Sequence, residues 1–192
     1  MDSRKINIKD VSTIGIFSAV LFAITILVGA LTGSLLELHM FSVAIIAFVS
    51  APVYYLIMAK VHKKGMVIST CAVVGILWGL MGGIPVLLSM ILCGIIGEFV
   101  LTKATYKSFA GLTVTYILYI IGYYGGAIAP LYYWKDFYYR QGRPAEVVDE
   151  LIKASQSIYA YISIPMMVVM AIAGAFLARK ILKKHIERAG VL

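Results

Sequence analysis

"MVISTCAVVGILWGLMGGIPVLLSMILCGIIGEFVL", residues 66–101, is an apolar run with a single charged side chain, Glu98, near its end. A helix rises about 1.5 Å per residue and crosses the hydrocarbon layer in about 20 residues, so this run is too long for one crossing. Two glycines followed by a proline at residues 82–85 make a poor helix interior. The run therefore predicts a tight hairpin at residues 81–85 between two spans, residues 66–83 and 85–101.

Four more apolar runs flank this hairpin, at residues 11–31, 41–59, 109–131 and 157–178. Pro52 is expected to kink the second of these four runs, and Pro165 is expected to bend the last. The chain is 61% hydrophobic and 14% charged, whereas soluble domains average about 45–50% apolar and about 25% charged residues. These features predict an all-α integral membrane protein, with six transmembrane helices in a single domain that spans residues 1–192.

Basic residues are distributed unequally between the two sides of this six-span arrangement. Thirteen of the seventeen Lys and Arg residues fall on the side that holds both termini, and only Lys135, Arg140, Arg143 and Lys153 fall on the other. Cytoplasmic loops carry an excess of Lys and Arg. We therefore expect a multi-pass protein of the cell membrane with both termini cytoplasmic. On this interpretation the net charge of +8 reflects topology, and no nucleic acid partner is expected.

The largest segment on the outer side is "WKDFYYRQGRPAEVVDELIKAS", residues 134–155. Its second half begins with Pro144, a favourable first residue of a helix, and places four aliphatic residues at helical spacing: Val147, Val148, Leu151 and Ile152. This pattern predicts a short amphipathic helix on the outer surface, between the fifth and sixth spans.

Motifs for catalysis and energy coupling are missing from the chain. It has no H-E-x-x-H, no G-x-S-x-G and no phosphate-binding G-x-x-x-x-G-K-[ST] motif, and its three histidines lack metal-ligand spacing. No ionisable residue is predicted at mid-depth, where ion pathways need one. We therefore expect no enzyme, no metal site and no cofactor. If the protein moves a solute, a separate ATPase would supply the energy from ATP.

Aromatic residues gather in and around the fifth span. Tyr116, Tyr119 and Tyr123 recur at helical spacing, while Trp78 and Tyr159 approach from neighbouring spans. One interpretation is the interfacial belt of Trp and Tyr that membrane proteins share. The other is a pocket that opens outward, in which aromatic faces hold a ligand and hydroxyl groups orient it. Glycines at 122, 125 and 126 either leave room for that ligand or allow helices to pack closely.

The outer loop "GSLLELHM", residues 33–40, carries Glu37 and His39. It is either an ordinary polar turn or a lid that closes the pocket. As part of a lid, Glu37 would pair with a ligand amine or with a cation of another loop.

Gly15, Ala19 and Ala23 fall at every fourth position of the first span, and we call them the small-residue ridge. Small residues at this spacing let another helix approach closely. The approaching helix is either a partner protein's or a neighbour in the same bundle. The sixth span has a second ridge of small residues that could pack on the first: Ala171, Gly174, Ala175 and Ala178.

A small, basic, six-span chain with such a ridge on its first helix resembles the S components, the substrate-binding subunits, of energy-coupling factor (ECF) transporters. Within that family it looks closest to a branch labelled MptD-like or Trep/Strep. The resemblance implies binding of a vitamin or similar micronutrient near the outer face, and assembly with a T subunit and two ATPases. It also implies that the small-residue ridge docks on the T subunit, with Gly15 in place of the usual first Ala.

The tyrosines point to a planar or conjugated ligand, and the scarcity of buried charge argues against a small, highly charged one. Two other functions remain open from the sequence: a membrane scaffold that binds no ligand, and a small stand-alone secondary transporter.

Overall fold

The computed structural model describes residues 6–104 and 108–183, and within them the chain is helical with no strand. The helices are α1 (Ile8–Thr32), α2 (Leu36–Met40), α3 (Ser42–Val49), α4 (Ala51–Val61), α5 (Met66–Leu80), α6 (Ile84–Ala104), α7 (Phe109–Ala127), α8 (Pro130–Tyr133), α9 (Lys135–Arg140), α10 (Ala145–Ser155) and α11 (Ile158–Ile181).

Four helical segments are long and apolar enough to cross a membrane: α1, α6, α11, and α7 continued through α8. The pair α3 and α4 makes a fifth candidate if it counts as one span, and a bend of 42° separates its halves. The remaining predicted span, residues 66–83, folds as α5, an apolar helix of only 15 residues. The described residues thus support four or five spans of the six that the sequence predicts.

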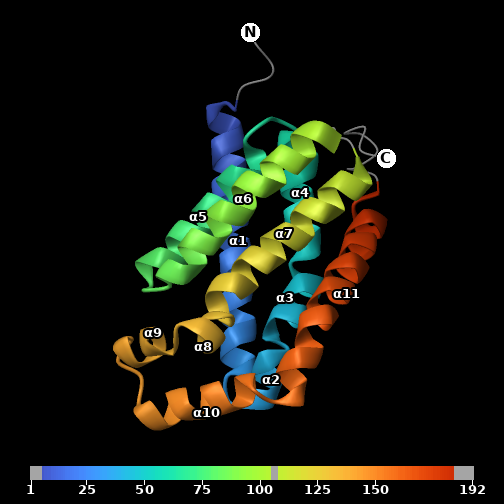
Figure 1. Cartoon of the computed structure of the whole chain (residues 1–192). Coiled ribbons are helices and arrows are strands. Elements are labelled where there is room, and N and C mark those ends of the chain that lie inside the picture. The colour runs from blue at the N-terminus through green and yellow to red at the C-terminus, as the bar shows by residue number, and fades with distance from the viewer. Residues whose placement is uncertain (1–5, 105–107, 184–192) are drawn as a thin grey trace.

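The long helices lie side by side, and two ends of the bundle can be distinguished (Figure 1). At one end, the termini end, α1 begins and α11 finishes. At the other, the covered end, lie α2 and α8–α10. Helix α6 packs between α5 and α7, α11 packs on α3 and α4, and α1 packs on α4 and α5. The predicted hairpin at residues 81–85 is confirmed, because α5 ends at Leu80 and α6 begins at Ile84.

The break between α3 and α4 confirms the kink expected at Pro52. Proline has no N–H, so it cannot donate to the carbonyl four residues earlier, and a helix in lipid then needs another donor nearby. The carbonyl that loses its donor to Pro52 is that of Phe48. At the same break, the Tyr116 hydroxyl of α7 donates to the neighbouring Ala47 carbonyl and lies 2.9 Å from the Ser50 hydroxyl. By contrast, α11 continues as one helix through Pro165.

The second ridge, on α11, packs against this break. A Cβ atom built on Gly174 would lie 2.8 Å from the Ala47 carbonyl oxygen and 2.9 Å from the Ala51 Cβ. Ala171, Ala175 and Ala178 are fully buried. The small residues of α11 therefore serve the internal packing of the bundle.

Large apolar side chains are exposed around the sides of the bundle, on α1, α6 and α11 among others. The described charged residues lie at its two ends. At the termini end, Lys63 Nζ lies 2.6 Å from Asp10 Oδ2, while the Glu98 carboxylate accepts backbone N–H bonds from Gly65 (2.6 Å) and Val67 (3.1 Å) at the start of α5. An apolar perimeter between two polar ends is what a lipid bilayer requires.

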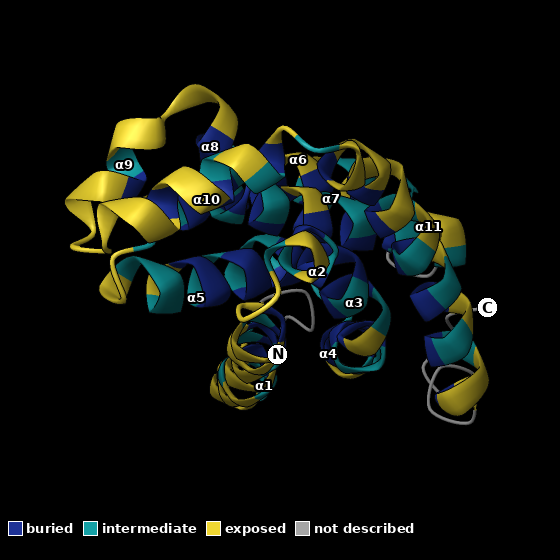
Figure 2. Cartoon of the chain, turned by 90° about the horizontal axis from the view of Figure 1, so that it is seen from below, coloured by how far each residue is buried: buried dark blue, intermediate teal, exposed yellow. Residues whose placement is uncertain are grey.

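The predicted amphipathic helix is confirmed as α10. Val148 and Leu151 are buried, whereas Glu146, Asp149 and Glu150 are exposed. Viewed from the covered end, α10 lies across the bundle with its outer side exposed, and α1 lies at the edge (Figure 2).

Candidate functional site

A cavity of about 420 Å³ lies at the covered end. Its wall comes from the last turns of α1, from α2, from the hairpin between α5 and α6, from the end of α7, and from α8–α10. Differences in helix length explain the space. At about 1.5 Å per residue, α1 is about 37 Å long and α5 is about 22 Å long, so the hairpin stops short of α2 and α10.

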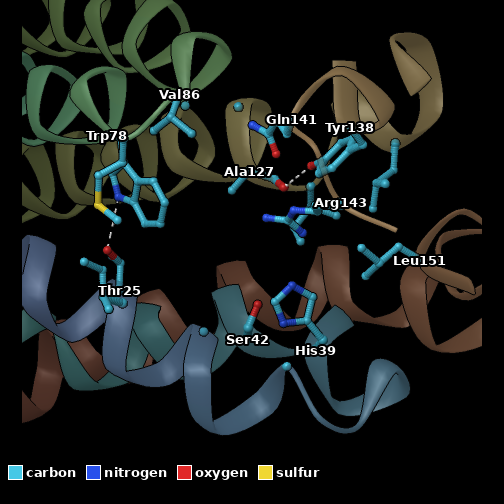
Figure 3. A pocket seen from close by; sticks show the side chains of 18 of the residues that line it. Thr25, His39, Ser42, Trp78, Val86, Ala127, Tyr138, Gln141, Arg143 and Leu151 are labelled. Carbon is cyan, nitrogen blue, oxygen red and sulfur yellow. Dashed lines mark hydrogen bonds between the residues drawn. The ribbon is translucent and has the colours of Figure 1, made fainter. Parts of the chain in front are cut away.

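Trp78 and Tyr123 form the aromatic side of this cavity, with ring centroids 5.8 Å apart. Trp78 Nε1 donates to Thr25 Oγ1 over 3.2 Å, and Thr25 in turn donates to the Phe22 carbonyl (Figure 3). This chain of hydrogen bonds fixes the indole plane against α1. Gly29, one turn beyond Thr25, also lines the cavity, and a Cβ there would have no neighbour within 4 Å.

The segment that closes the cavity at the covered end, α8–α10, is held to the rest of the bundle by hydrogen-bond contacts. The Tyr138 hydroxyl donates to the Ala127 carbonyl, and the Gln141 amide lies 3.5 Å from the Gly82 carbonyl of the short hairpin. Burial raises the pKa of Tyr138 to about 12, so the phenol stays protonated and remains a donor. Residues 141–144 link α9 to α10, and Gly142 within them has φ +73°, a backbone conformation that favours glycine.

His39 and Arg143 face one another across the cavity. The Arg143 side chain points from the link between α9 and α10 towards His39 on α2 (Figure 3). His39 Nδ1 lies 3.2 Å from the Thr32 hydroxyl. Burial, and then the positive charge of Arg143, lowers the pKa of His39, so the imidazole is neutral at neutral pH.

The structure brings together three of the seven predicted ligand residues: Trp78, Tyr123 and His39 line the cavity. The other four lie outside its lining. Glu37 is exposed on α2, and among the described residues it forms no ion pair. Tyr159 is half-exposed and packs edge-on against Phe41 at 6.4 Å.

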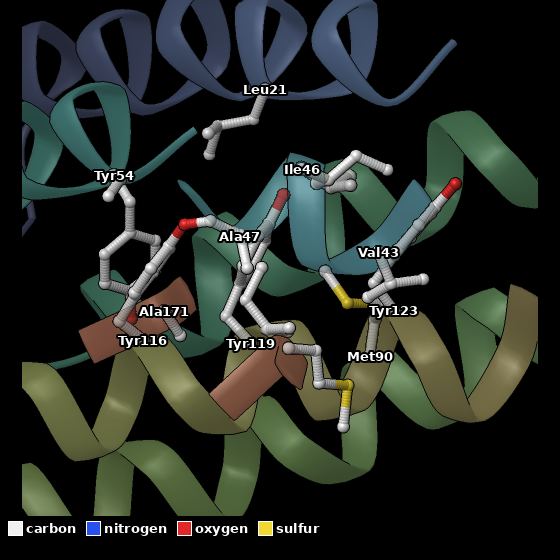
Figure 4. Packing of buried hydrophobic residues seen from close by; sticks show 14 of the residues in the cluster. Leu21, Val43, Ile46, Ala47, Tyr54, Met90, Tyr116, Tyr119, Tyr123 and Ala171 are labelled. Atoms are coloured by element: carbon white, nitrogen blue, oxygen red, sulfur yellow. The ribbon is translucent and has the colours of Figure 1, made fainter. Parts of the chain in front are cut away.

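Tyr116 and Tyr119 belong to the hydrophobic core, deeper in the bundle than the cavity. Both are 0% exposed, and with Tyr123 they project from α7 towards α1 (Figure 4). Their rings stack at 6.2 Å on each other and pack on Tyr54 of α4. The helical spacing therefore identified one shared face of α7, of which only the Tyr123 end reaches the cavity.

The three glycines beside these tyrosines allow close packing of α6 and α7. A Cβ on Gly126 would lie 2.2 Å from the Val86 Cα, and one on Gly122 would lie 3.0 Å from the Cys93 Cβ. The helix-packing alternative thus accounts for them, although Gly126 also lines the cavity.

Several cavity residues were not singled out from the sequence, above all Thr25, Tyr138 and Arg143. Thr25 is one of several polar residues in an otherwise apolar span, and nothing in the local sequence distinguishes it from the others. Tyr138 and Arg143 precede an amphipathic helix that was expected to lie on the outer surface, whereas that helix covers a cavity. A signal was present in "RQGRP", residues 140–144, where glycine and proline mark a turn flanked by two arginines.

The small-residue ridge is uncovered. Ala19 and Ala23 are exposed, and a Cβ on Gly15 would have no neighbour within 4 Å. The buried residues of α1 form a different stripe that includes Ile14, Leu21 and Val28. With 3.6 residues per turn, the ridge is rotated about 140° from that stripe. The bundle's own α11, whose ridge is buried elsewhere, does not occupy it.

No group of three or more possible metal ligands occurs among the residues that the structure describes. The helical bundle, its apolar perimeter and its polar ends define the chain as an integral membrane protein. A family model described as "Hypothetical bacterial integral membrane protein (Trep_Strep)" matches residues 8–188, and the chain belongs to this family. Comparisons with curated proteins and with solved structures found no match.

Proposed function

We propose that the chain is the substrate-binding S component of an ECF-type importer. It captures a vitamin-like or other micronutrient small molecule, and a T subunit with two ATPases drives its release. The cavity of about 420 Å³ is the observation that carries this proposal. Small-molecule sites measure about 300–1,000 Å³ and combine apolar walls with a few polar groups. The Trp78–Tyr123 wall, with Thr25, His39 and Arg143 around it, has this character.

The uncovered small-residue ridge supports docking on a T subunit. In lipid, helices associate through close van der Waals packing, for which small residues are suited. The ridge lies on the face of α1 that points away from the bundle, and the Ala19 and Ala23 side chains on that face are small. A partner helix can therefore approach and separate without rearranging the cavity.

The proposal places the termini end in the cytoplasm and the covered end outside. Of the described Lys and Arg residues, eight lie at the termini end (Lys9, Lys60, Lys63, Lys64, Lys103, Arg179, Lys180 and Lys183) and four at the covered end. This imbalance favours that orientation. Five further basic residues assigned to the cytoplasmic side, Arg4, Lys5, Lys107, Lys184 and Arg188, lie outside the described residues. With this orientation the cavity opens towards external solutes.

Ligand binding is tested with Gly29→Leu, which fills the cavity from α1. Because a Cβ at Gly29 meets nothing within 4 Å, we expect the variant to fold. Purified protein is mixed with the dialysable small molecules of a rich growth medium, and bound compounds are identified by native mass spectrometry. We expect a bound compound in the wild type and its loss in Gly29→Leu. Equal binding by both proteins would exclude this cavity as the site.

Partner docking is tested with Ala19→Trp, and Val20→Trp is the control. Val20 is also exposed, but it is about 100° further around the helix. Each variant is co-expressed with the T subunit and ATPases of the same genome. We expect Ala19→Trp to abolish co-purification and to retain the ligand, whereas Val20→Trp retains both. Unfolding of Ala19→Trp alone would assign the ridge to internal packing. Uptake by proteoliposomes without ATPases would instead indicate a secondary transporter.

A further inference from the structure

Arg143 is the only side chain in the cavity wall with a full charge, within the part of the chain that the structure describes. No Asp or Glu lines the cavity, and His39 opposite is neutral at neutral pH. Arg143 lies 5.7 Å from the centre of the Tyr138 ring and forms no ion pair with a described carboxylate. Its guanidinium is exposed to the cavity and so has donors available for a ligand.

The placement of charges on residues 135–155, the segment that covers the cavity, favours an anion on the side of this segment that faces the cavity. Residues 135–155 contain four basic and four acidic residues, so the segment has no net charge of its own. Its four acidic residues are exposed and line no part of the cavity: Asp136, Glu146, Asp149 and Glu150. Asp149 accepts a hydrogen bond from Tyr139. The folded segment therefore presents a cation inward even though its composition is neutral.

A more open hollow of about 430 Å³ shares Arg143 with the cavity, together with Met81, Phe137 and Gln141. Its wall adds a second cation, Arg140, and again includes no acidic residue. Two cations along one approach raise the local concentration of anions there. The hollow and the cavity thus meet at Arg143, and among the described residues the lining of both carries positive charge and no negative charge.

We infer that the ligand of this site carries a carboxylate or phosphate group, which Arg143 binds at the mouth of the cavity while an apolar, ring-containing body lies against Trp78 and Tyr123. The planar guanidinium donates two parallel hydrogen bonds to two oxygens of such a group. This inference rests on the proposed function, because it assigns the chemical class of the ligand for the same cavity.

The test uses Trp78 as a reporter within the site. The chain has two tryptophans, Trp78 and Trp134, and only Trp78 lines the cavity, so the Trp134→Phe background leaves one emitter. The dialysable small molecules of a rich growth medium are separated on an anion exchanger into a retained and an unretained fraction. Each fraction is titrated into the protein in detergent while Trp78 emission is recorded.

We expect the retained fraction alone to change the emission. Arg143→Gln should require about tenfold or more of that fraction for the same change, which corresponds to loss of a charge-assisted hydrogen bond. Arg143→Lys keeps the charge without the planar fork and should give an intermediate shift. Lys135→Gln, which removes an exposed cation of α9 outside both hollows, is the matched control and should change nothing.

The outcomes separate the two proposals. A response to the unretained fraction alone, or an unchanged titration in Arg143→Gln, overturns the anionic ligand and leaves ligand binding in place. No response to either fraction overturns the proposed function and this inference with it. If Arg143→Gln does not fold, Arg143→Lys decides, because an unchanged titration in that variant also overturns the inference.

Discussion

Two tyrosines on one face of α7 provide a matched test of the packing described above. Tyr116 and Tyr119 are both 0% exposed and stack on each other. The Tyr116 hydroxyl hydrogen-bonds to Ala47 and Ser50 at the break between α3 and α4. The Tyr119 hydroxyl is buried without a hydrogen-bond partner among the described residues. Replacing each with Phe removes the same atom from the same environment, and only the hydrogen bonding differs.

The expected magnitudes follow from that difference. Tyr116→Phe leaves the Ala47 carbonyl without its hydroxyl donor next to a proline-interrupted helix, and an unsatisfied buried group of this kind costs about 1–3 kcal/mol. Tyr119→Phe removes a buried hydroxyl that has no partner, so it should leave the free energy of unfolding unchanged or raise it. The two variants should differ by about 2 kcal/mol, or about 4–8 °C in melting temperature for a chain of this size.

The assay is thermal unfolding of the two variants and the wild type in one detergent, followed by near-ultraviolet circular dichroism. The same samples are mixed with the small-molecule fraction that binds the wild type. Because neither tyrosine lines the cavity, both variants should bind it as the wild type does.

Equal destabilisation by the two substitutions would refute the reasoning about hydrogen bonds at the break. Loss of ligand by Tyr119→Phe with an unchanged melting temperature would refute the placement of the cavity, and would return Tyr119 to the binding site.

Three further predictions can be checked in the same way. Gly174→Ala should destabilise the bundle by about 1–3 kcal/mol, because its Cβ would lie 2.8 Å from a backbone oxygen, whereas Gly15→Ala, with open space around it, should not lower the melting temperature. Glu98→Gln should cost about 1–2 kcal/mol in chemical unfolding, because it weakens the acceptor for three backbone N–H groups at the start of α5. The lowered pKa of His39 means that the folded state binds this proton less well than the unfolded state; melting temperature should therefore fall as the pH drops below about 6.5, less steeply in His39→Gln.

Much of the fold was predictable because membrane helices are specified by long apolar runs and by helix breakers. The hairpin at residues 81–85, the kink at Pro52 and the amphipathic helix α10 all follow from local sequence. The length of α5 did not, because the apolar run continues through Gly82 and Gly83 although the helix ends at Leu80. Hydrophobicity indicates which residues avoid water. It does not indicate the residue at which a helix ends within an apolar run.

The site was harder to predict for a related reason. Trp78, Tyr123 and His39 were identified by residue type and approximate depth, but the same criteria also selected Tyr116 and Tyr119, which form the core. Arg143 was assigned to a surface segment, and its inward direction depends on the turn at Gly142 and on α10 lying across the bundle. The direction of the Arg143 side chain is set by tertiary packing, and the helical periodicity of a sequence does not predict tertiary packing.

The short hairpin between α5 and α6 has a consequence for the lipid around the protein. Its turn stops short of α2 and α10 (Figure 1), and the N–H groups of Gly82 and Gly83 donate to the carbonyls of Gly79 and Trp78. Helix α5, with 15 residues, rises about 22 Å, which is less than the hydrocarbon thickness of about 30 Å, and a bilayer accommodates a short apolar helix by thinning around it. We therefore expect the bilayer to be thinner beside this hairpin, so that water lies closer to the cavity that the hairpin helps to line.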